Sequence, residues 1–156
     1  MSVVTLAVRV PRAPADGVAA LLAPDGVFVF EVHYLGKVVD EMQYDMIYHE
    51  HLYYYSLVSA IAHFARYGMV VFDVKPVPIH AGSMRFYVCK QGSRHAAQVS
   101  DAVRSLEKQE RERGFDRYET CKRFSDDVAA TREALMALVT RLRAAGKRIA
   151  GYGASG

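Results

Sequence analysis

Pro24-Asp25-Gly26-Val27-Phe28-Val29-Phe30-Glu31-Val32 is the stretch that decides the fold. Pro, Asp and Gly form a turn, and the run from Val27 to Val32 is almost continuously apolar and rich in β-branched residues. Such a run is typical of a strand buried in a parallel sheet. Because residues 17–22 before it read as the end of a short helix, the chain is expected to be α/β, beginning with the tail of a doubly wound, Rossmann-like domain.

Helical and strand patterns alternate after this point. Ser56 can cap a helix that Gly68 ends, and Met69–Val74 and Met84–Lys90 are expected strands. Further helices are expected over residues 93–113 and from Ser125 to Gly146. The last has an apolar stripe expected to pack on the core, made of Val128, Leu135, Leu138, Val139 and Leu142. The loop between Leu35 and Gln43 is the expected domain boundary.

Composition excludes several classes of protein. The 156 residues are 51% hydrophobic and 24% charged, which suits a globular chain and not a disordered one. Two isolated cysteines give no disulfide framework, residues 1–23 lack a signal-peptide core, and no apolar run spans a bilayer, so a cytoplasmic location without membrane contact is expected. The net charge is only +3, and the basic residues of 104–117 alternate with acidic ones, so no nucleic-acid partner is expected.

The densest group of reactive side chains is Tyr48-His49-Glu50-His51-Leu52-Tyr53-Tyr54-Tyr55-Ser56. Histidine takes or gives a proton near neutral pH, and a neighbouring carboxylate or phenol can orient it, so the cluster indicates acid/base chemistry on an organic substrate. Two alternatives remain: an amphipathic surface of half-buried rings, and the metal site of a hydrolase using His49, Glu50, His51 and His80. The chain has no H-E-x-x-H or C-x-x-C motif to support a metal site, and no bound metal is expected.

Three motifs together indicate a family. Val29-Phe30-Glu31-Val32-His33-Tyr34-Leu35, then residues 48–57, then Pro78-Ile79-His80-Ala81-Gly82-Ser83-Met84-Arg85 occur in an order and spacing that resembles the C-methyltransferases acting on nucleotide-linked keto sugars. The resemblance covers about residues 18–156. The usual form of the third motif has Gly where this chain has Ala81.

The resemblance implies a domain organisation. Residues 1–40 would be the C-terminal part of a methyltransferase domain that uses S-adenosylmethionine, and residues 41–156 the beginning of a second Rossmann-like domain. The family's methyl-donor pocket precedes Val27, and residues 1–16 depart from its pattern, so we expect a fragment that binds no donor and is inactive alone. Gly151-Tyr152-Gly153-Ala154-Ser155-Gly156 matches G-x-G-x-x-G after an apparent strand at residues 148–150, but in the family this turn does not bind the donor.

The resemblance also implies catalytic roles. A carbon next to a ketone must lose a proton before it attacks a methyl group, so a base and an enolate-stabilising group are needed. Carried over, His51 is the base, Glu50 orients it, and Tyr48 donates a hydrogen bond at the reacting centre. We expect a turn here, because Tyr48 and His51 share a face at i, i+3 but oppose each other in a strand.

The remaining candidate residues are assigned to the nucleotide-linked keto sugar. Small residues and an arginine suit phosphate or hydroxyl groups, so His80, Gly82, Ser83 and Arg85 are expected to bind substrate, together with His49 and with His33 and Tyr34 at a strand's carboxyl end. The structural alternative is a hairpin with Arg85 paired to a surface acid. A noncatalytic sugar-nucleotide-binding or assembly module remains the alternative function. The sugar, the reacting carbon, the nucleotide, the stereochemical outcome and the oligomeric state stay open.

Overall fold

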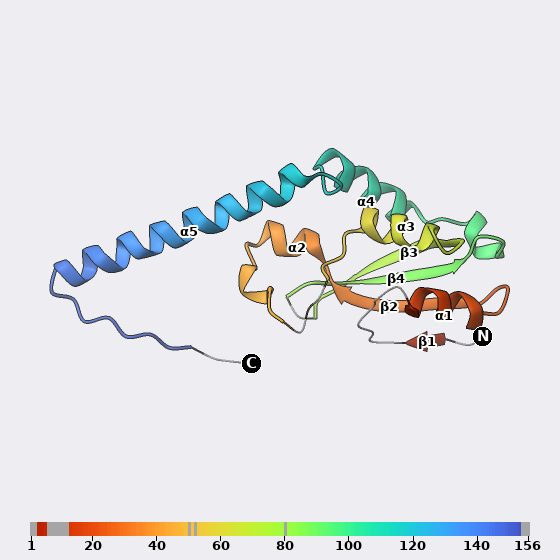
Figure 1. Ribbon diagram of the computed structural model, residues 1–156, viewed down its shortest axis with the longest axis horizontal. Helices are drawn as coiled ribbons and strands as arrows, with labels where there is room; N and C mark the ends of the chain where they lie inside the picture. Colours follow the sequence, from red (N-terminus) through yellow and green to blue (C-terminus); the bar gives the residue numbers. More distant parts are fainter. Residues whose placement is uncertain (1–2, 6–12, 50, 52, 80, 154–156) are drawn as a thin grey trace.

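A mixed four-stranded sheet with the order β1-β2-β4-β3 organises the chain (Figure 1). The computed structural model describes residues 3–5, 13–49, 51, 53–79 and 81–153. The strands are β1 (Val3–Thr5), β2 (Val27–His33), β3 (Met69–Val77) and β4 (Ser83–Lys90). β1 runs parallel to β2, whereas β2 with β4 and β3 with β4 are antiparallel.

The strand predicted at residues 27–32 is present, but a doubly wound parallel sheet is not confirmed. β2 pairs in parallel with β1 over three residue pairs only, and antiparallel with β4 over seven, from Val27–Cys89 to His33–Ser83. Burial alternates along the first part of β2, with Phe28 and Phe30 buried and Val27 and Val29 only partly so. The apolar run therefore reflects one buried face and one half-covered face, which an antiparallel pair also provides.

Seven helical segments accompany the sheet in the described part of the chain. They are α1 (Ala13–Leu21), α2 (Leu35–Asp40), η1 (Tyr44–Met46), α3 (Leu57–Ala65), η2 (Arg94–Ala97), α4 (Asp101–Glu112) and α5 (Tyr118–Ala144). The predicted cap of α3 is confirmed, since Ser56 and Ser59 form a reciprocal capping box, and Gly68 follows it with φ +65°. Two predicted helix bounds were wrong, and the segment expected as a loop at residues 35–43 is partly helical.

Each wrong bound has a local cause. The expected boundary loop at 35–43 contains α2, and strands on both sides of it share one sheet; the division of domains at residue 40 stays a prediction. The helix expected over 93–113 is split, because the Ser100 hydroxyl accepts from Val103 N and caps a new helix. The helix expected from Ser125 begins at Tyr118, directly after a turn in which Arg117 N bonds Gly114 O.

The core lies between the sheet and the helices α3 and α4, which cover one face of it (Figure 1). Its centre is an aromatic stack: the Phe30 ring centroid lies 4.8 Å from Phe86, 5.3 Å from Phe64 and 5.4 Å from Phe28. Leu57 and Phe86 have no exposed surface. Burying apolar rings in this way is the main stabilising contribution to such a layer.

α5 extends away from this core (Figure 1). None of its 27 residues is buried, and Leu135 and Leu138 are 55% and 41% exposed, so the expected packing of its apolar stripe is absent. Gly146, with φ +70°, ends the helix as predicted, but residues 148–150 form no strand. No helix among the described residues is both long enough and apolar enough to cross a membrane.

Candidate functional site

The segment after η1 turns as the i, i+3 pairing of Tyr48 and His51 predicts. His51 N donates to Tyr48 O at 3.0 Å, and the two ring centroids lie 4.6 Å apart. The Tyr48 side chain is exposed and His51 is half-buried. A phenol and an imidazole are therefore presented together at the surface, while Glu50, their predicted partner, lies outside the described residues.

The backbone fixes the orientation of the His51 ring. His51 Nδ1 lies 3.3 Å from Met46 O, and the Tyr54 hydroxyl donates to the same carbonyl at 2.8 Å. A carbonyl oxygen accepts and cannot donate, so the proton of the neutral ring belongs on Nδ1. Nε2 then carries the lone pair, as a general base requires.

A second histidine stands beside this ring. His33, buried at the end of β2, has its ring centroid 5.8 Å from that of His51 and 6.2 Å from that of Tyr54. Its Nε2 lies 3.1 Å from Gln43 Oε1. β2 and the turn after η1 thus bring together two predicted site residues that are 18 positions apart in the sequence.

Gln43 connects His33 to the third motif. Its buried side chain donates from Nε2 to Ala81 O at 3.0 Å and to Glu41 Oε2 at 2.7 Å, while Oε1 faces His33. Every polar atom of this amide is engaged, which holds the His33 ring and the 79–82 turn in one arrangement. The sequence gives no signal for this role, because a single Gln belongs to no motif.

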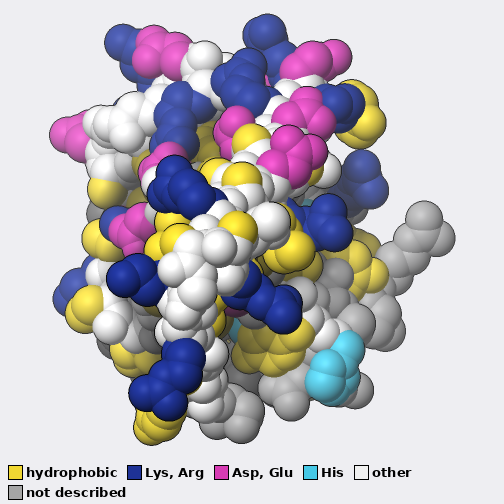
Figure 2. All heavy atoms as spheres, turned by 90° about the vertical axis from the view of Figure 1, so that its left-hand side faces the viewer, with side chains coloured by type: hydrophobic (Ala, Val, Ile, Leu, Met, Phe, Trp, Pro, Cys, Tyr) yellow, Lys and Arg dark blue, Asp and Glu magenta, His cyan; other side chains and the backbone are white. Residues whose placement is uncertain are grey.

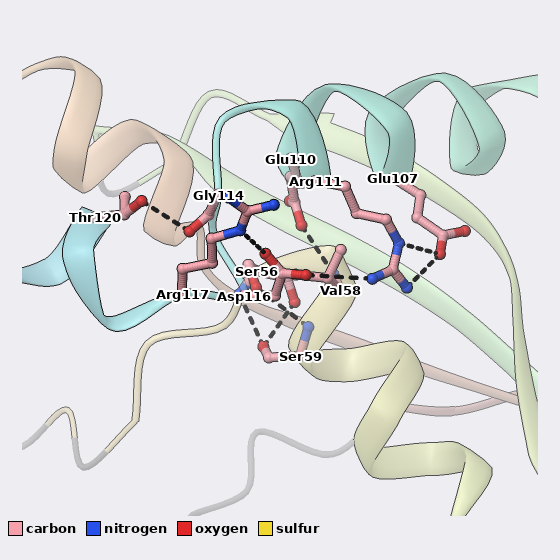
Figure 3. Close-up of polar contacts among 10 residues, drawn as sticks. All are labelled: Ser56, Val58, Ser59, Glu107, Glu110, Arg111, Gly114, Asp116, Arg117 and Thr120. Atoms are coloured by element: carbon pink, nitrogen blue, oxygen red, sulfur yellow. Dashed lines mark hydrogen bonds and ion pairs between the residues drawn. The ribbon is translucent and has the colours of Figure 1, made fainter.

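Tyr34 has a structural partner that the sequence did not indicate. Its hydroxyl donates to Glu110 Oε1 at 2.8 Å, and Glu110 also accepts from Leu57 N and Val58 N at 2.8 Å each. Figure 3 shows Glu110 beside the α3 cap formed by Ser56 and Ser59. Burial, and then the nearby Glu110 charge, raise the pKa of the Tyr34 phenol far above its usual range.

The third motif forms a hairpin turn between β3 and β4. Gly82 N donates to Ile79 O at 3.0 Å, Gly82 O accepts from Tyr34 N at 3.2 Å, and the buried Ser83 hydroxyl donates to Ile79 O at 3.1 Å. Ala81 and Gly82 have φ of +58° and +123°. His80 lies outside the described residues. The turn matches the hairpin alternative, and a ligand role for Gly82 and Ser83 stays a prediction.

Arg85 and His49 differ in their surroundings. Arg85 donates from Nε and Nη2 to Glu31 Oε2 at 3.1 and 2.8 Å, and the two residues are direct cross-strand neighbours. The guanidinium already has a carboxylate partner, as the hairpin alternative expects. His49 is exposed, and its ring centroid lies 6.4 Å from Tyr48.

The side chains and turns described so far bear on whether the chain could hold a metal ion or the methyl donor. No group of three His, Cys, Asp or Glu side chains in the described part of the chain could hold a metal ion, although Glu50 and His80 are outside it. Donor binding in Rossmann-like folds needs a parallel strand, a glycine-rich turn and a helix. Gly151-Tyr152-Gly153 is exposed coil without a preceding strand, so this turn does not fit the donor.

Comparison with known proteins bears on this geometry. Residues 78–156 match the family model described as the C-methyltransferase C-terminal domain. The chain is also 38% identical over 139 residues, 89% of its length, to the C-methyltransferase NovU of Streptomyces niveus. It spans about a third of that protein, 33% of its length.

Proposed function

The chain belongs to the C-methyltransferase family, and on this premise we propose that it supplies the base that prepares a nucleotide-linked keto-deoxysugar for C-methylation. His51 removes the proton, Tyr48 donates a hydrogen bond to the developing enolate oxygen, and Glu50 orients His51. The substrate-binding candidates are His33, Tyr34 and His49 and the turn with His80, Gly82, Ser83 and Arg85. Two of them, Tyr34 and Arg85, already bond the carboxylates of Glu110 and Glu31.

One observation carries the proposal. The Met46 carbonyl holds His51 Nδ1, which leaves the Nε2 lone pair for the substrate, and the Tyr48 ring stands 4.6 Å away on the exposed side. The pair supplies an acceptor for a carbon-bound proton and a donor for the oxygen of the same carbonyl group.

The proposed step balances within the chain and its substrate. His51 Nε2 takes the proton from the carbon next to the ketone, and the electron pair of the C–H bond moves to the carbonyl oxygen, giving an enolate and an imidazolium. S-adenosylmethionine is the methyl donor that the family implies. The Gly151-Tyr152-Gly153 turn does not fit this donor, and the step proposed for this chain ends at the enolate.

Hydrogen–deuterium exchange tests proton removal without any donor. The chain is incubated with the keto sugar nucleotide in D₂O, and exchange at the carbons beside the ketone is followed by NMR. His51→Asn is expected to slow the exchange by about 100-fold or more, since general bases contribute roughly 10²–10⁴-fold. In the complete enzyme the same change should stop methyl transfer while substrate affinity stays within a few-fold.

His95→Asn is the matched control, because the His95 ring stacks on Phe72 at 5.2 Å on another element, η2. Exchange that persists in His51→Asn would remove His51 from the mechanism. A wild-type chain that binds the sugar nucleotide but exchanges nothing would favour the noncatalytic binding module. A stoichiometric metal in the purified protein would favour the metal-dependent hydrolase instead.

A further inference from the structure

Two adjoining cavities form one groove between α2 and the first turns of α5. They measure about 180 and 160 Å³ and share Val39, Phe115, Thr120 and Phe124 as walls. Thr120 holds this end of α5 in place, because its hydroxyl bonds the carbonyls of Gly114 at 2.7 Å and Arg113 at 3.2 Å. Figure 3 shows the contact with Gly114.

One half of the groove is apolar and reaches the proposed catalytic turn. Its further walls include Leu35, Val38, Ile47 and Tyr54. Tyr54 shares the Met46 carbonyl with His51, and their ring centroids are 5.9 Å apart. A molecule whose reacting end lies at His51 can therefore extend into this half.

The other half carries positive charge. Arg113 and Arg123 line it together with Asp127. Arg113 lies 4.6 Å over the Phe115 ring and pairs with Asp40, whereas Arg123 has no ion pair within the described residues. Figure 2 shows Lys and Arg side chains on this side of the molecule, with hydrophobic, Asp and Glu side chains among them.

We propose that this groove binds the deoxysugar diphosphate part of the substrate, with the deoxysugar in the apolar half and the diphosphate at Arg123, beside the Arg113–Asp40 pair. The proposal rests on the proposed function. Missing hydroxyls give a deoxysugar apolar faces that suit the apolar walls. A diphosphate needs charge-assisted, bidentate donors, which guanidinium groups supply. Arg85, the other candidate, is already bound to Glu31.

Binding to the chain itself tests the anionic half. Inorganic diphosphate is titrated at low salt, with affinity measured by calorimetry and its site mapped by NMR chemical shifts. Arg123→Ala is expected to weaken binding about 10-fold, the loss of one charge-assisted contact. Asp127→Asn should strengthen it. Lys122→Ala is the matched control, because this neighbour loses the same charge but pairs with Asp126 and does not line the groove.

Cys121 reports on the apolar half. It lines this half and is exposed, whereas Cys89, the second cysteine of the chain, is buried. A deoxysugar nucleotide should slow the reaction of Cys121 with a thiol reagent more than inorganic diphosphate does. Equal protection of Cys121 by the two ligands would contradict the placement of the sugar in the apolar half.

Several outcomes would overturn the groove. Equal losses in Arg123→Ala and Lys122→Ala would indicate general charge attraction, and absence of binding at millimolar ligand would leave no site. A loss in Arg85→Ala instead would place the phosphates at the hairpin, and the proposed function would survive. If diphosphate binding depends on Arg123 but the chain catalyses no deuterium exchange, the proposed function is contradicted and the groove is still supported as a binding site.

Discussion

The Tyr34 hydroxyl donates a 2.8 Å hydrogen bond to Glu110, a carboxylate that follows it by 76 residues and is 1% exposed. Through this contact the end of β2, which carries His33, is tied to α4. Because Glu110 also accepts from the first two amides of α3, one side chain joins three elements around the core.

Replacing Glu110 by Gln should destabilise the fold. The carboxylate accepts three hydrogen bonds through two oxygens, and an amide turns one of these acceptors into a donor facing a donor. We expect the free energy of unfolding to fall by about 2–3 kcal/mol in a denaturant titration.

Glu107→Gln on the same helix is the control, since Glu107 pairs with Arg111 at the surface. Such exposed pairs contribute roughly 0.3–0.5 kcal/mol. Equal losses in the two variants would show that Glu110 has no special role.

The Tyr34 phenol should make stability fall at alkaline pH. Its pKa is raised in the folded protein by burial and by Glu110, whereas an unfolded phenol ionises near pH 10. The stabilisation is therefore complete below about pH 10 and declines as the pH rises further. Tyr34→Phe should reduce the loss of unfolding free energy between pH 9 and 11, and identical pH profiles for both proteins would contradict this.

Ala81→Gly is expected to stabilise the hairpin. With φ +58°, Ala81 has a left-handed backbone that costs a non-glycine residue roughly 1–2 kcal/mol. Glycine avoids this cost, but its more flexible unfolded chain cancels part of the gain in stability. A net gain of about 0.5–1 kcal/mol should appear in thermal unfolding. Ala62→Gly, in the exposed interior of α3, should instead cost about 1 kcal/mol.

Gln43→Leu should loosen the site without unfolding the core. It removes the partner of Ala81 O and the acceptor next to His33 Nε2, so we expect a loss of about 1–3 kcal/mol and faster hydrogen exchange of the Gly82 amide. The exposed Gln98→Leu serves as the control. An unchanged Gly82 exchange rate would show that the turn does not depend on Gln43.

Local chemistry in the sequence predicted local structure well. The Ser56 cap, the glycine stops at Gly68 and Gly146 and the strands around residues 27–32, 69–74 and 84–90 all depend on nearest neighbours. The choice of partner for β2 depends on pairing with β4, more than 50 residues later, and apolar patterning does not encode that choice.

The site shows the same division. The i, i+3 spacing predicts the turn that joins Tyr48 to His51, and the carboxyl end of a strand predicts His33 and Tyr34 as site residues. The contacts that hold these side chains come from Gln43 and Glu110, which belong to no motif. Glu110 sits on a helix whose other charges are mostly exposed, so its burial is visible only in the tertiary structure.

The exposure of α5 divides that helix into two parts of different local stability. Its first two turns are held by Thr120 and Phe124 at the groove. Beyond Val128, almost nothing in the described part of the chain stabilises it except the helix's own hydrogen bonds. A single helix without packing is marginal in water, so this distal part opens in local fluctuations that leave β4 intact. The part of α5 that forms one wall of the groove is thus anchored, whereas the part of the helix after Val128 is free to fray.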